Sequence, residues 1–309
     1  PAGFKIASDS GNTVQQGVVI EDVNASTDEA VQGSQFVWIP VGVFIKDGGE
    51  SSNEIILGRY TFSTSTPGTP TLQQAAYTDE NPENYKNSKV IETYYDEYSG
   101  LHRDGIASSG LDGLNATAND LGAWIESVKE NGGYYIGRYE ASFASGSSVE
   151  NYKAATKVSE KYSTSSMSYI PGTLWNFITQ LEASKVAINT YEESRSVKSD
   201  LMNSYAWDTA IVYIQECGNT NYANQNSKNS SLANTGTNND EVCKINDMAS
   251  NIREWTTEYS SYAGSSFAYP CVTRGGYCYH SSGYAAGRNN DGIATLSVGG
   301  IGFRLSLYM

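Results

Sequence analysis

Clusters of apolar residues divide the chain into short strand-like and helix-like segments, which are separated by polar stretches. The runs 36–44 and 54–62 are rich in β-branched and aromatic residues, as strands are. Asp47-Gly48-Gly49 lies between them and favours a tight turn, so the two runs predict a β-hairpin. A further run of this kind, 134–140, predicts another strand.

Three segments repeat apolar residues every three or four positions, which places their side chains on one face of a helix. The three stripes are Leu121, Trp124, Ile125 and Val128; Leu174, Phe177, Ile178 and Leu181; and Trp207, Ala210, Ile211 and Ile214. Each is preceded by residues that can cap a helix: Asn119 or Asp120, then Thr173, then Asn203 or Ser204. We therefore predict three helices.

These elements predict an α+β fold in which a few helices pack against small antiparallel strands, with much irregular chain between them. Residues 1–35 are polar apart from the patch 17–20, and predict an N-terminal extension with a short strand or hairpin. Residues 36–309 form one domain, with a loop-rich insertion at about 64–116. Further short strands are predicted around Trp255, Val272 and Phe303.

Charge and composition narrow the range of partners. The net charge of -14 argues against nucleic acid, because binding to phosphates needs a basic face. No apolar run is long enough to cross a membrane. Tyr is abundant, with 23 residues against 8 Phe, and Ser, Asn and Thr are plentiful, which favours a secreted or adhesive protein. A β-rich fold alone would also explain the tyrosines. The chain starts at Pro1 without a signal peptide, so we expect a trimmed or mature piece.

The four cysteines, Cys217, Cys243, Cys271 and Cys278, lack the spacing of zinc ligands. Two disulfides with three connectivities are open, and so are four buried thiols. Of the pairings, we favour Cys243 with Cys271, because both lie next to the sequence words described below and outside the Tyr/Ser-rich run that follows.

Several short sequence motifs, called words here, occur in the order found in the formylglycine-generating enzyme (sulfatase-modifying factor) superfamily. The run 36–44 resembles its opening IP-x-G-x-F strand, 135–140 its Y-I-G-x-Y-E word, and 247–256 its D-M-x-G-N-V-x-E-W-T word. The family's EAEWE helix corresponds in position to Tyr205-Ala206-Trp207-Asp208. The family's RGGS motif, the Arg of its A-x-R motif and its closing GFR motif resemble Arg274-Gly275-Gly276, Arg288 and Gly302-Phe303-Arg304. The resemblance covers 36–309 and implies this family's variant of the C-type lectin fold.

The oxidases of that superfamily have two copper-binding cysteines shortly after the Gly-Gly word. In this chain Cys278 is the single cysteine after Gly276, and Cys271 comes before Gly276. One thiol supplies neither a two-thiolate copper site nor a redox pair. We therefore expect no enzyme activity and no required cofactor.

The chain is also similar to the variable proteins of diversity-generating retroelements, which display hypervariable loops on this fold. In them, mutation of Asn-type codons reaches every residue except Lys, Glu, Gln, Met and Trp. None of these five occurs between Tyr277 and Ile301, the segment that we take as variable. The resemblance implies a receptor or adhesin at a bacterial surface or on a phage virion, binding a protein or cell-surface ligand. A formylglycine-generating-type oxidase and a calcium-dependent sugar-binding lectin stay open as alternatives, as does the oligomeric state.

The run from Tyr277 has the composition of a binding surface. Tyr provides large rigid contacts that lose little rotamer entropy, while Ser, Gly and Asn adapt around it. The predicted ligand-binding residues are Tyr277, Tyr279, His280, Ser281, Ser282, Tyr284, Asn289, Asn290 and Asp291. Alternatively, some of these side chains alternate into the core, as in any strand.

Further roles follow from the resemblance. Glu254 would ligate calcium together with neighbouring backbone carbonyls, or would instead accept backbone hydrogen bonds within its turn. The resemblance also implies a group of structural residues, with the two arginines buried in ion pairs: Trp255, Gly275, Gly276, Arg288, Phe303 and Arg304.

Overall fold

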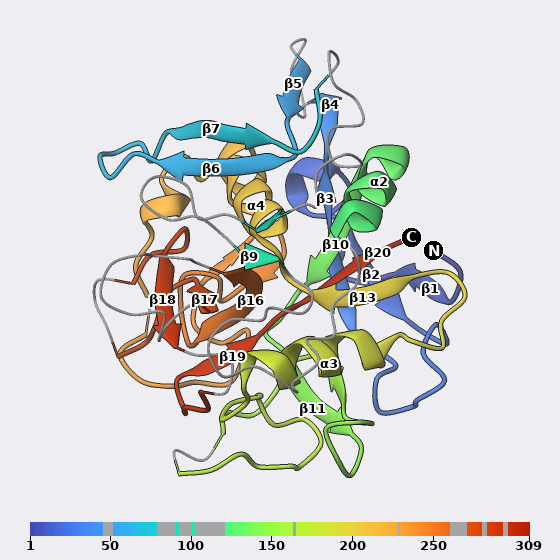
Figure 1. The fold of residues 1–309 in the computed structure, drawn as a ribbon. Helices are drawn as coiled ribbons and strands as arrows, with labels where there is room; N and C mark the ends of the chain where they lie inside the picture. Colours follow the sequence, from blue (N-terminus) through green and yellow to red (C-terminus); the bar gives the residue numbers. More distant parts are fainter. Residues whose placement is uncertain are drawn as a thin grey trace.

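A computed structural model describes residues 1–45, 52–78, 91–92, 101–102, 121–162, 165–227, 229–259, 271–279, 283–292 and 296–309. The described chain has an α+β fold, in which mostly antiparallel strands form two larger sheets and several hairpins, with helices packed against them (Figure 1). The fold class predicted from the sequence is confirmed at this level.

The helices of the described chain are α2 (Leu121–Asn131), α3 (Gln180–Thr190) and α4 (Ser204–Glu216), with the short 3-10 helices η1 (Val14–Gln16) and η2 (Tyr222–Asn224). The strands are β1 (Phe4–Ile6), β2 (Val19–Asp22), β3 (Gln35–Pro40), β4 (Gly42–Ile45), β5 (Ser52–Ile55), β6 (Gly58–Phe62), β7 (Pro70–Ala75), β8 (Ile91–Glu92), β9 (Leu101–His102), β10 (Gly133–Gly137), β11 (Ser142–Ser145), β12 (Lys153–Ala155), β13 (Lys198–Leu201), β14 (Glu241–Val242), β15 (Ile245–Asn246), β16 (Arg253–Tyr259), β17 (Cys271–Arg274), β18 (Arg288–Gly292), β19 (Ile301–Phe303) and β20 (Leu305–Tyr308).

The larger sheet has the strand order β1-β2-β3-β10-β20-β13, and its neighbouring strands are antiparallel. In its middle strand β10, Ile136 pairs with Val37 of β3 on one side and with Ser306 of β20 on the other. The predicted N-terminal extension therefore does not stand apart from the domain, because β1 and β2 continue this sheet.

The smaller sheet has the order β18-β17-β16-β19. Strand β16 pairs antiparallel with β17, where Trp255 faces Thr273, and parallel with β19, where Trp255 faces Phe303. The short strands predicted around Trp255, Val272 and Phe303 are confirmed, and they lie side by side. This sheet carries the C-terminal part of the chain that the sequence marks as a binding face.

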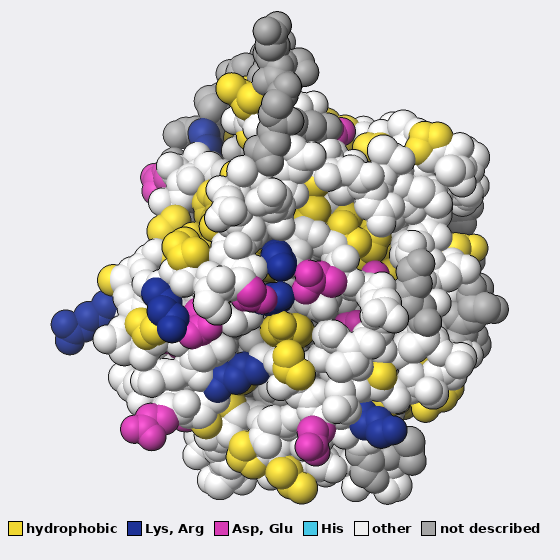
Figure 2. All heavy atoms as spheres, turned by 180° about the vertical axis from the view of Figure 1, so that it is seen from behind, with side chains coloured by type: hydrophobic (Ala, Val, Ile, Leu, Met, Phe, Trp, Pro, Cys, Tyr) yellow, Lys and Arg dark blue, Asp and Glu magenta, His cyan; other side chains and the backbone are white. Residues whose placement is uncertain are grey.

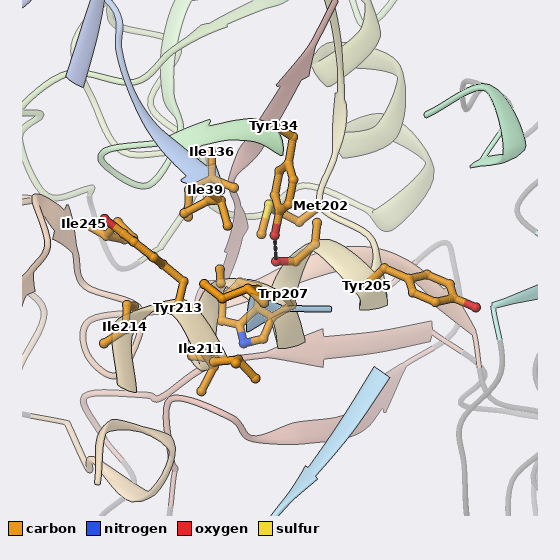
Figure 3. Packing of buried hydrophobic residues seen from close by; sticks show 14 of the residues in the cluster. Ile39, Tyr134, Ile136, Met202, Tyr205, Trp207, Ile211, Tyr213, Ile214 and Ile245 are labelled. Carbon is orange, nitrogen blue, oxygen red and sulfur yellow. Dashed lines mark hydrogen bonds between the residues drawn. The ribbon is translucent and has the colours of Figure 1, made fainter. Parts of the chain in front are cut away.

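Helix α4 lies between the two sheets and contacts β3, β6 and β16. Its N-cap is Asn203, whose side chain accepts a hydrogen bond from the amide of Ala206 at 2.8 Å, as the sequence predicts. Tyr134 of β10 donates its hydroxyl hydrogen to the carbonyl of Ala206 at 2.6 Å (Figure 3). Trp207 is fully buried and donates its indole N–H to the carbonyl of Ala285 at 2.9 Å. The helix thus ties the larger sheet to the C-terminal segment.

The first and third predicted helices are confirmed as α2 and α4, but the second is wrong in position. Leu174 forms a β-bridge with Ser142, and Phe177 has a left-handed φ of 47°, so this part of the chain is not helical. Helix α3 begins only after Thr179, whose side chain and that of Glu182 form a reciprocal capping box. The stronger cap decides where the helix begins.

Each of the two long predicted strands is divided. The run 36–44 forms β3 and β4, and the run 54–62 contributes to β5 and β6. Strands β4 and β5 pair antiparallel, as expected for the hairpin, although its turn at 47–48 lies outside the described residues. Strand β7 pairs with β6, so the predicted insertion 64–116 begins with regular structure.

None of the four cysteines, all of them among the described residues, forms a disulfide bond, so the favoured Cys243–Cys271 disulfide is wrong. Cys271 is fully buried in β17, where it packs in the hydrophobic cluster that contains Trp255 and Phe303. Cys243 packs against the other large cluster, and its thiol contacts that of Cys217. The two predicted partners therefore belong to different parts of the core.

Within the part of the chain that the structure describes, no helix is both long enough and apolar enough to span a membrane. On the face drawn in Figure 2, basic and acidic side chains lie intermixed near the centre, and hydrophobic side chains are scattered between polar ones.

Candidate ligand-binding site

A tight glycine turn after β17 sets the start of the predicted binding segment. Gly275 has a left-handed φ of 86°, and the amide of Gly276 donates to the carbonyl of Met248 at 3.2 Å. A Cβ atom on Gly276 would lie 1.7 Å from the carbonyl oxygen of Ala249, which is backbone and cannot swing away. Only glycine allows this close approach, so the structural role expected for both glycines has a physical cause.

The segment that follows lies partly in the core and partly in solvent. Tyr277 is half-buried, Cys278 is buried and Tyr279 is 52% exposed. The amide of Cys278 donates to the carbonyl of Asn251 at 3.0 Å, which holds the segment on the turn before β16. The rings of Tyr277 and Tyr279 meet edge to face with centroids 5.4 Å apart. Tyr279 therefore faces solvent, while Cys278 and part of Tyr277 pack in the same hydrophobic cluster. Residues 278 and 279 form a turn, so the alternation of a strand does not apply here.

The other predicted contact residues divide into two groups. Tyr284 is 42% exposed and Asn289 is half-buried in β18. His280, Ser281 and Ser282, and the side chains of Asn290 and Asp291, lie outside the described residues.

A cavity of about 420 Å³ opens beside Tyr277 and Tyr279. Its lining comes from segments far apart in the sequence: Tyr162, Phe177, Arg253, Tyr277, Tyr279, Leu296, Val298, Gly299, Gly300 and Ile301. This volume is within the range of small-molecule pockets or of a pocket for one large side chain of a protein partner. The lining is largely aromatic and aliphatic, with Arg253 as its cationic residue.

The glycines of the cavity wall let two aromatic rings come close to the backbone. A Cβ atom on Gly300 would lie 2.4 Å from the Tyr277 hydroxyl oxygen, and one on Gly299 would lie 2.9 Å from the Phe177 ring. The guanidinium carbon of Arg253 lies 5.6 Å from the centroid of the Tyr277 ring, a cation–π distance. Tyr277 is thus held from two sides and presents a fixed wall to the cavity.

Burial raises the pKa of both Tyr162 and Tyr277 above the ordinary value for a phenol. Both hydroxyl groups therefore stay protonated at neutral pH. They can donate as well as accept hydrogen bonds, which suits binding to carbonyl, hydroxyl or amide groups of a ligand.

Sequence reasoning missed Tyr162, Phe177 and Arg253 as members of this site. The predicted helical stripe includes Phe177, but the left-handed backbone of this residue turns the chain beside Gly299. Arg253 stands inside the word 247–256, next to Glu254 and Trp255, where only those two residues drew attention. Tyr162 carried no local signal, because only the tertiary fold brings it near Tyr277.

Glu254 forms an ion pair. It is buried, and its carboxylate accepts hydrogen bonds from the guanidinium of Arg304 at 2.7 and 3.1 Å. Arg304 also donates to the backbone carbonyls of Gly137 and Asn246. The structure thus gives Glu254 a partner other than the calcium or turn amides expected for it. Among the described residues, no group of three or more His, Cys, Asp or Glu side chains is arranged to hold a metal ion.

The two predicted structural arginines are both buried in ion pairs. Arg304 pairs with Glu254, as above, and Arg288 pairs with Asp208 at 2.9 Å and with Glu258 at 2.7 Å. Trp255 and Phe303 are fully buried, as expected. These contacts join the word at 254 to that at 304, and the word at 208 to that at 288.

Cys278 lacks the surroundings of a reactive thiol. It is 5% exposed among Tyr162, Leu174, Leu232 and Ile252. Burial, and then the nearby Glu140 carboxylate, raise its pKa to about 11. Because the thiolate is both the nucleophile and the metal-binding form, this residue is poorly suited to either role at neutral pH.

No family model, curated protein or solved structure matches this chain.

A buried carboxyl beneath the site provides a pH test. Asp240 accepts hydrogen bonds from the hydroxyl of Tyr222 at 3.1 Å and from the amide of Ala249 at 3.0 Å, and so holds the turn that lies under Gly276. Burial, only partly offset by a hydrogen bond from Ser250, raises the pKa of Asp240 from 3.8 to about 6. Below pH 4 the protonated group favours the folded state, and this contribution is lost as the pH rises through 6.

We expect the free energy of unfolding of the wild type to fall, relative to Asp240→Asn, by up to about 3 kcal/mol between pH 4 and 7.5. The amide keeps the shape of the side chain but does not titrate. Urea unfolding of both proteins across this range measures the difference, and carbon NMR of the Asp240 carboxyl should show a midpoint near 6. A midpoint at the ordinary aspartate value of 3.8, with parallel stability curves, would contradict the assignment.

Proposed function

We propose that this protein is a non-catalytic ligand-binding protein with a C-type lectin-like scaffold, acting at a bacterial surface or on a phage. Its binding face comprises the segment 277–291 and the cavity beside Tyr277 and Tyr279. The ligand is a protein or another cell-surface molecule that inserts a side chain or sugar-sized group into this cavity. Variation of the segment 277–301 would adapt the face to different ligands.

The observation that carries the proposal is the position of the cavity. The tyrosines singled out by composition, Tyr277 and Tyr279, form one of its walls, although nothing in the composition requires a cavity there. Tyr is enriched at binding hot spots, because it buries a large area and still offers a hydroxyl group. A fixed aromatic wall beside a cavity is the arrangement expected of a binding hot spot.

The contacts between the sequence words support the family resemblance. Gly276 passes over Ala249, Arg304 pairs with Glu254, and Arg288 pairs with Asp208. Each contact joins two words that the resemblance had matched separately. We therefore retain the retroelement variable proteins as the proposed family. Sequencing of the flanking DNA tests this proposal, since a reverse transcriptase gene and a near-identical repeat of the segment 277–301 should lie beside this gene.

The two alternatives receive no such support. A formylglycine-generating-type oxidase requires a reactive cysteine pair, and the Cys278 thiol is buried with a raised pKa. A calcium-dependent lectin would use Glu254, whose carboxylate is held by Arg304. We therefore assign no catalytic residue and no required cofactor.

Tyr279→Ala is expected to weaken ligand binding by at least about thirtyfold, because truncating an aromatic hot-spot residue costs about 2 kcal/mol or more. Its melting temperature should stay nearly that of the wild type, because the side chain is 52% exposed. The probe is an array of bacterial envelope proteins and polysaccharides, and each hit is titrated with both proteins.

The matched control is Tyr169→Ala. Tyr169 is 54% exposed, close to the value for Tyr279, and it stacks on Tyr152 outside the cavity lining. Binding that is lost in Tyr279→Ala and kept in Tyr169→Ala supports the proposed face. Equal binding by all three proteins would place the binding site elsewhere.

A further inference from the structure

Two cysteines that are distant in the sequence meet beside the hydrophobic cluster that contains Tyr213 and Trp207. Cys217 ends helix α4, and Cys243 lies in the turn between β14 and β15. Their thiols are in hydrogen-bond contact with each other, and the hydroxyl of Tyr213 contacts both. Each cysteine is partly exposed, so a small oxidant can reach the pair.

The backbone holds both thiols in place. The amide of Cys217 donates to the carbonyl of Tyr213 at 2.9 Å and so completes the last turn of α4. Cys243 and Lys244 both have left-handed φ angles, 50° and 65°, which is the geometry of a tight two-residue hairpin turn. A Cβ atom on Gly17 would lie 2.1 Å from the carbonyl oxygen of Cys243, so this turn is packed directly against a neighbouring backbone.

We propose that Cys217 and Cys243 form a disulfide bond when the protein meets an oxidising environment. The oxidant is a low-molecular-weight or protein disulfide, such as glutathione disulfide. Cys217 is the attacking thiolate, because the hydrogen bond with Cys217 and burial raise the pKa of the Cys243 thiol. It attacks a sulfur of this disulfide, releases one thiol and forms a mixed disulfide, which removes that hydrogen bond from Cys243. The second thiolate then displaces the other thiol. The protein gains one S–S bond and loses two hydrogens, and the oxidant is reduced to two thiols.

The bond would close the loop 218–242, which supports the binding face. Within it, the carbonyls of Ala223 and Gln225 accept hydrogen bonds from the amides of Ala286 and Ala285, each at 3.1 Å, and Asn226 forms a β-bridge with Tyr284. Cross-linking the two ends of this loop reduces the freedom of the unfolded chain. It would thereby stabilise the backbone under Tyr284 without altering the contact residues themselves.

The test uses the whole chain in a buffer of equimolar glutathione and glutathione disulfide, followed by alkylation of the remaining thiols and trypsin digestion. The four cysteines fall in four separate tryptic peptides, 199–228, 229–244, 254–274 and 275–288, so mass spectrometry distinguishes every pairing. We expect 199–228 to be linked to 229–244, with the other two peptides alkylated. This mapping uses the wild-type protein, so its result does not depend on whether any variant folds.

A double variant with serine at Cys271 and Cys278 serves as the control, and it should form the same link. The oxidised wild type should melt roughly 5 °C or more above the reduced protein. In Cys217→Ser that difference should vanish. Alkylation of both 199–228 and 229–244 in the redox buffer, or a link from 229–244 to 254–274, would overturn the proposal.

Discussion

Asp208→Ala should lower the free energy of unfolding by about 3–5 kcal/mol, enough to prevent many domains from folding, because it leaves buried charges without a partner. Asp208 is fully buried in α4 and forms ion pairs with Arg274 and Arg288. It also accepts a hydrogen bond from the amide of Tyr60 at 3.0 Å. Although burial alone would raise the pKa of Asp208, the two guanidinium groups hold it below the usual range.

The substitution would act on the site as well as on stability. Arg274 ends β17 immediately before the glycine turn, and Arg288 begins β18 at the far end of the binding segment. Asp208 therefore joins both ends of that segment to α4. Loss of its carboxylate removes one of the two negative charges that Arg274 and Arg288 share, and the remaining pairs with Glu258 do not balance both guanidinium groups.

Urea unfolding monitored by circular dichroism measures the effect. Asp9→Ala is a suitable control, since Asp9 is 53% exposed and shares Arg138 with Glu241, so its removal should cost less than about 1 kcal/mol. Asp208→Asn keeps the volume and removes only the charge, and it should fall between the two. If Asp208→Ala proved as stable as Asp9→Ala, the ion pairs would not be the link between α4 and the smaller sheet.

The sequence predicts a helix correctly where the spacing of apolar residues and a capping residue indicate the same start. Helix α4 combines a stripe at helical spacing with a capping Asn203, and it forms where expected. At 174–181 the spacing is equally good, but the competing capping box of Thr179 and Glu182 delays the helix. The spacing of apolar residues cannot show that Leu174 lies outside the helix. Leu174 instead forms a β-bridge with Ser142, and this pairing depends on a segment that is distant in the chain.

The candidate site was predictable only along the segment whose composition differs from the rest. Tyr277 and Tyr279 are such residues, but the turn at 278–279, which buries Cys278 between them, is not visible in the composition. The cavity beside them is a tertiary feature, because Tyr162, Phe177 and Arg253 come from three other segments. The ion pair of Glu254 was also hidden, since Arg304 lies far along the chain.

Trp255→Ala should destabilise the protein by about 3–5 kcal/mol, the usual cost of truncating a buried aromatic side chain. Trp255 is fully buried in β16, between its partners Thr273 in β17 and Phe303 in β19. Its indole N–H donates to the carbonyl of Ile178 at 2.9 Å, so the substitution opens a cavity and also removes a buried hydrogen bond.

Two further variants separate these contributions. Trp255→Phe keeps an aromatic ring and loses the indole N–H, so we expect a smaller loss of about 1–3 kcal/mol. Trp38→Ala removes a half-buried tryptophan that meets Tyr135 on the larger sheet, and it should cost less than Trp255→Ala because less area leaves the core. Denaturant unfolding of the three variants gives the order. If Trp255→Ala were as stable as the wild type, the word 247–256 would not anchor the smaller sheet. The family resemblance that rests on this word would then fail.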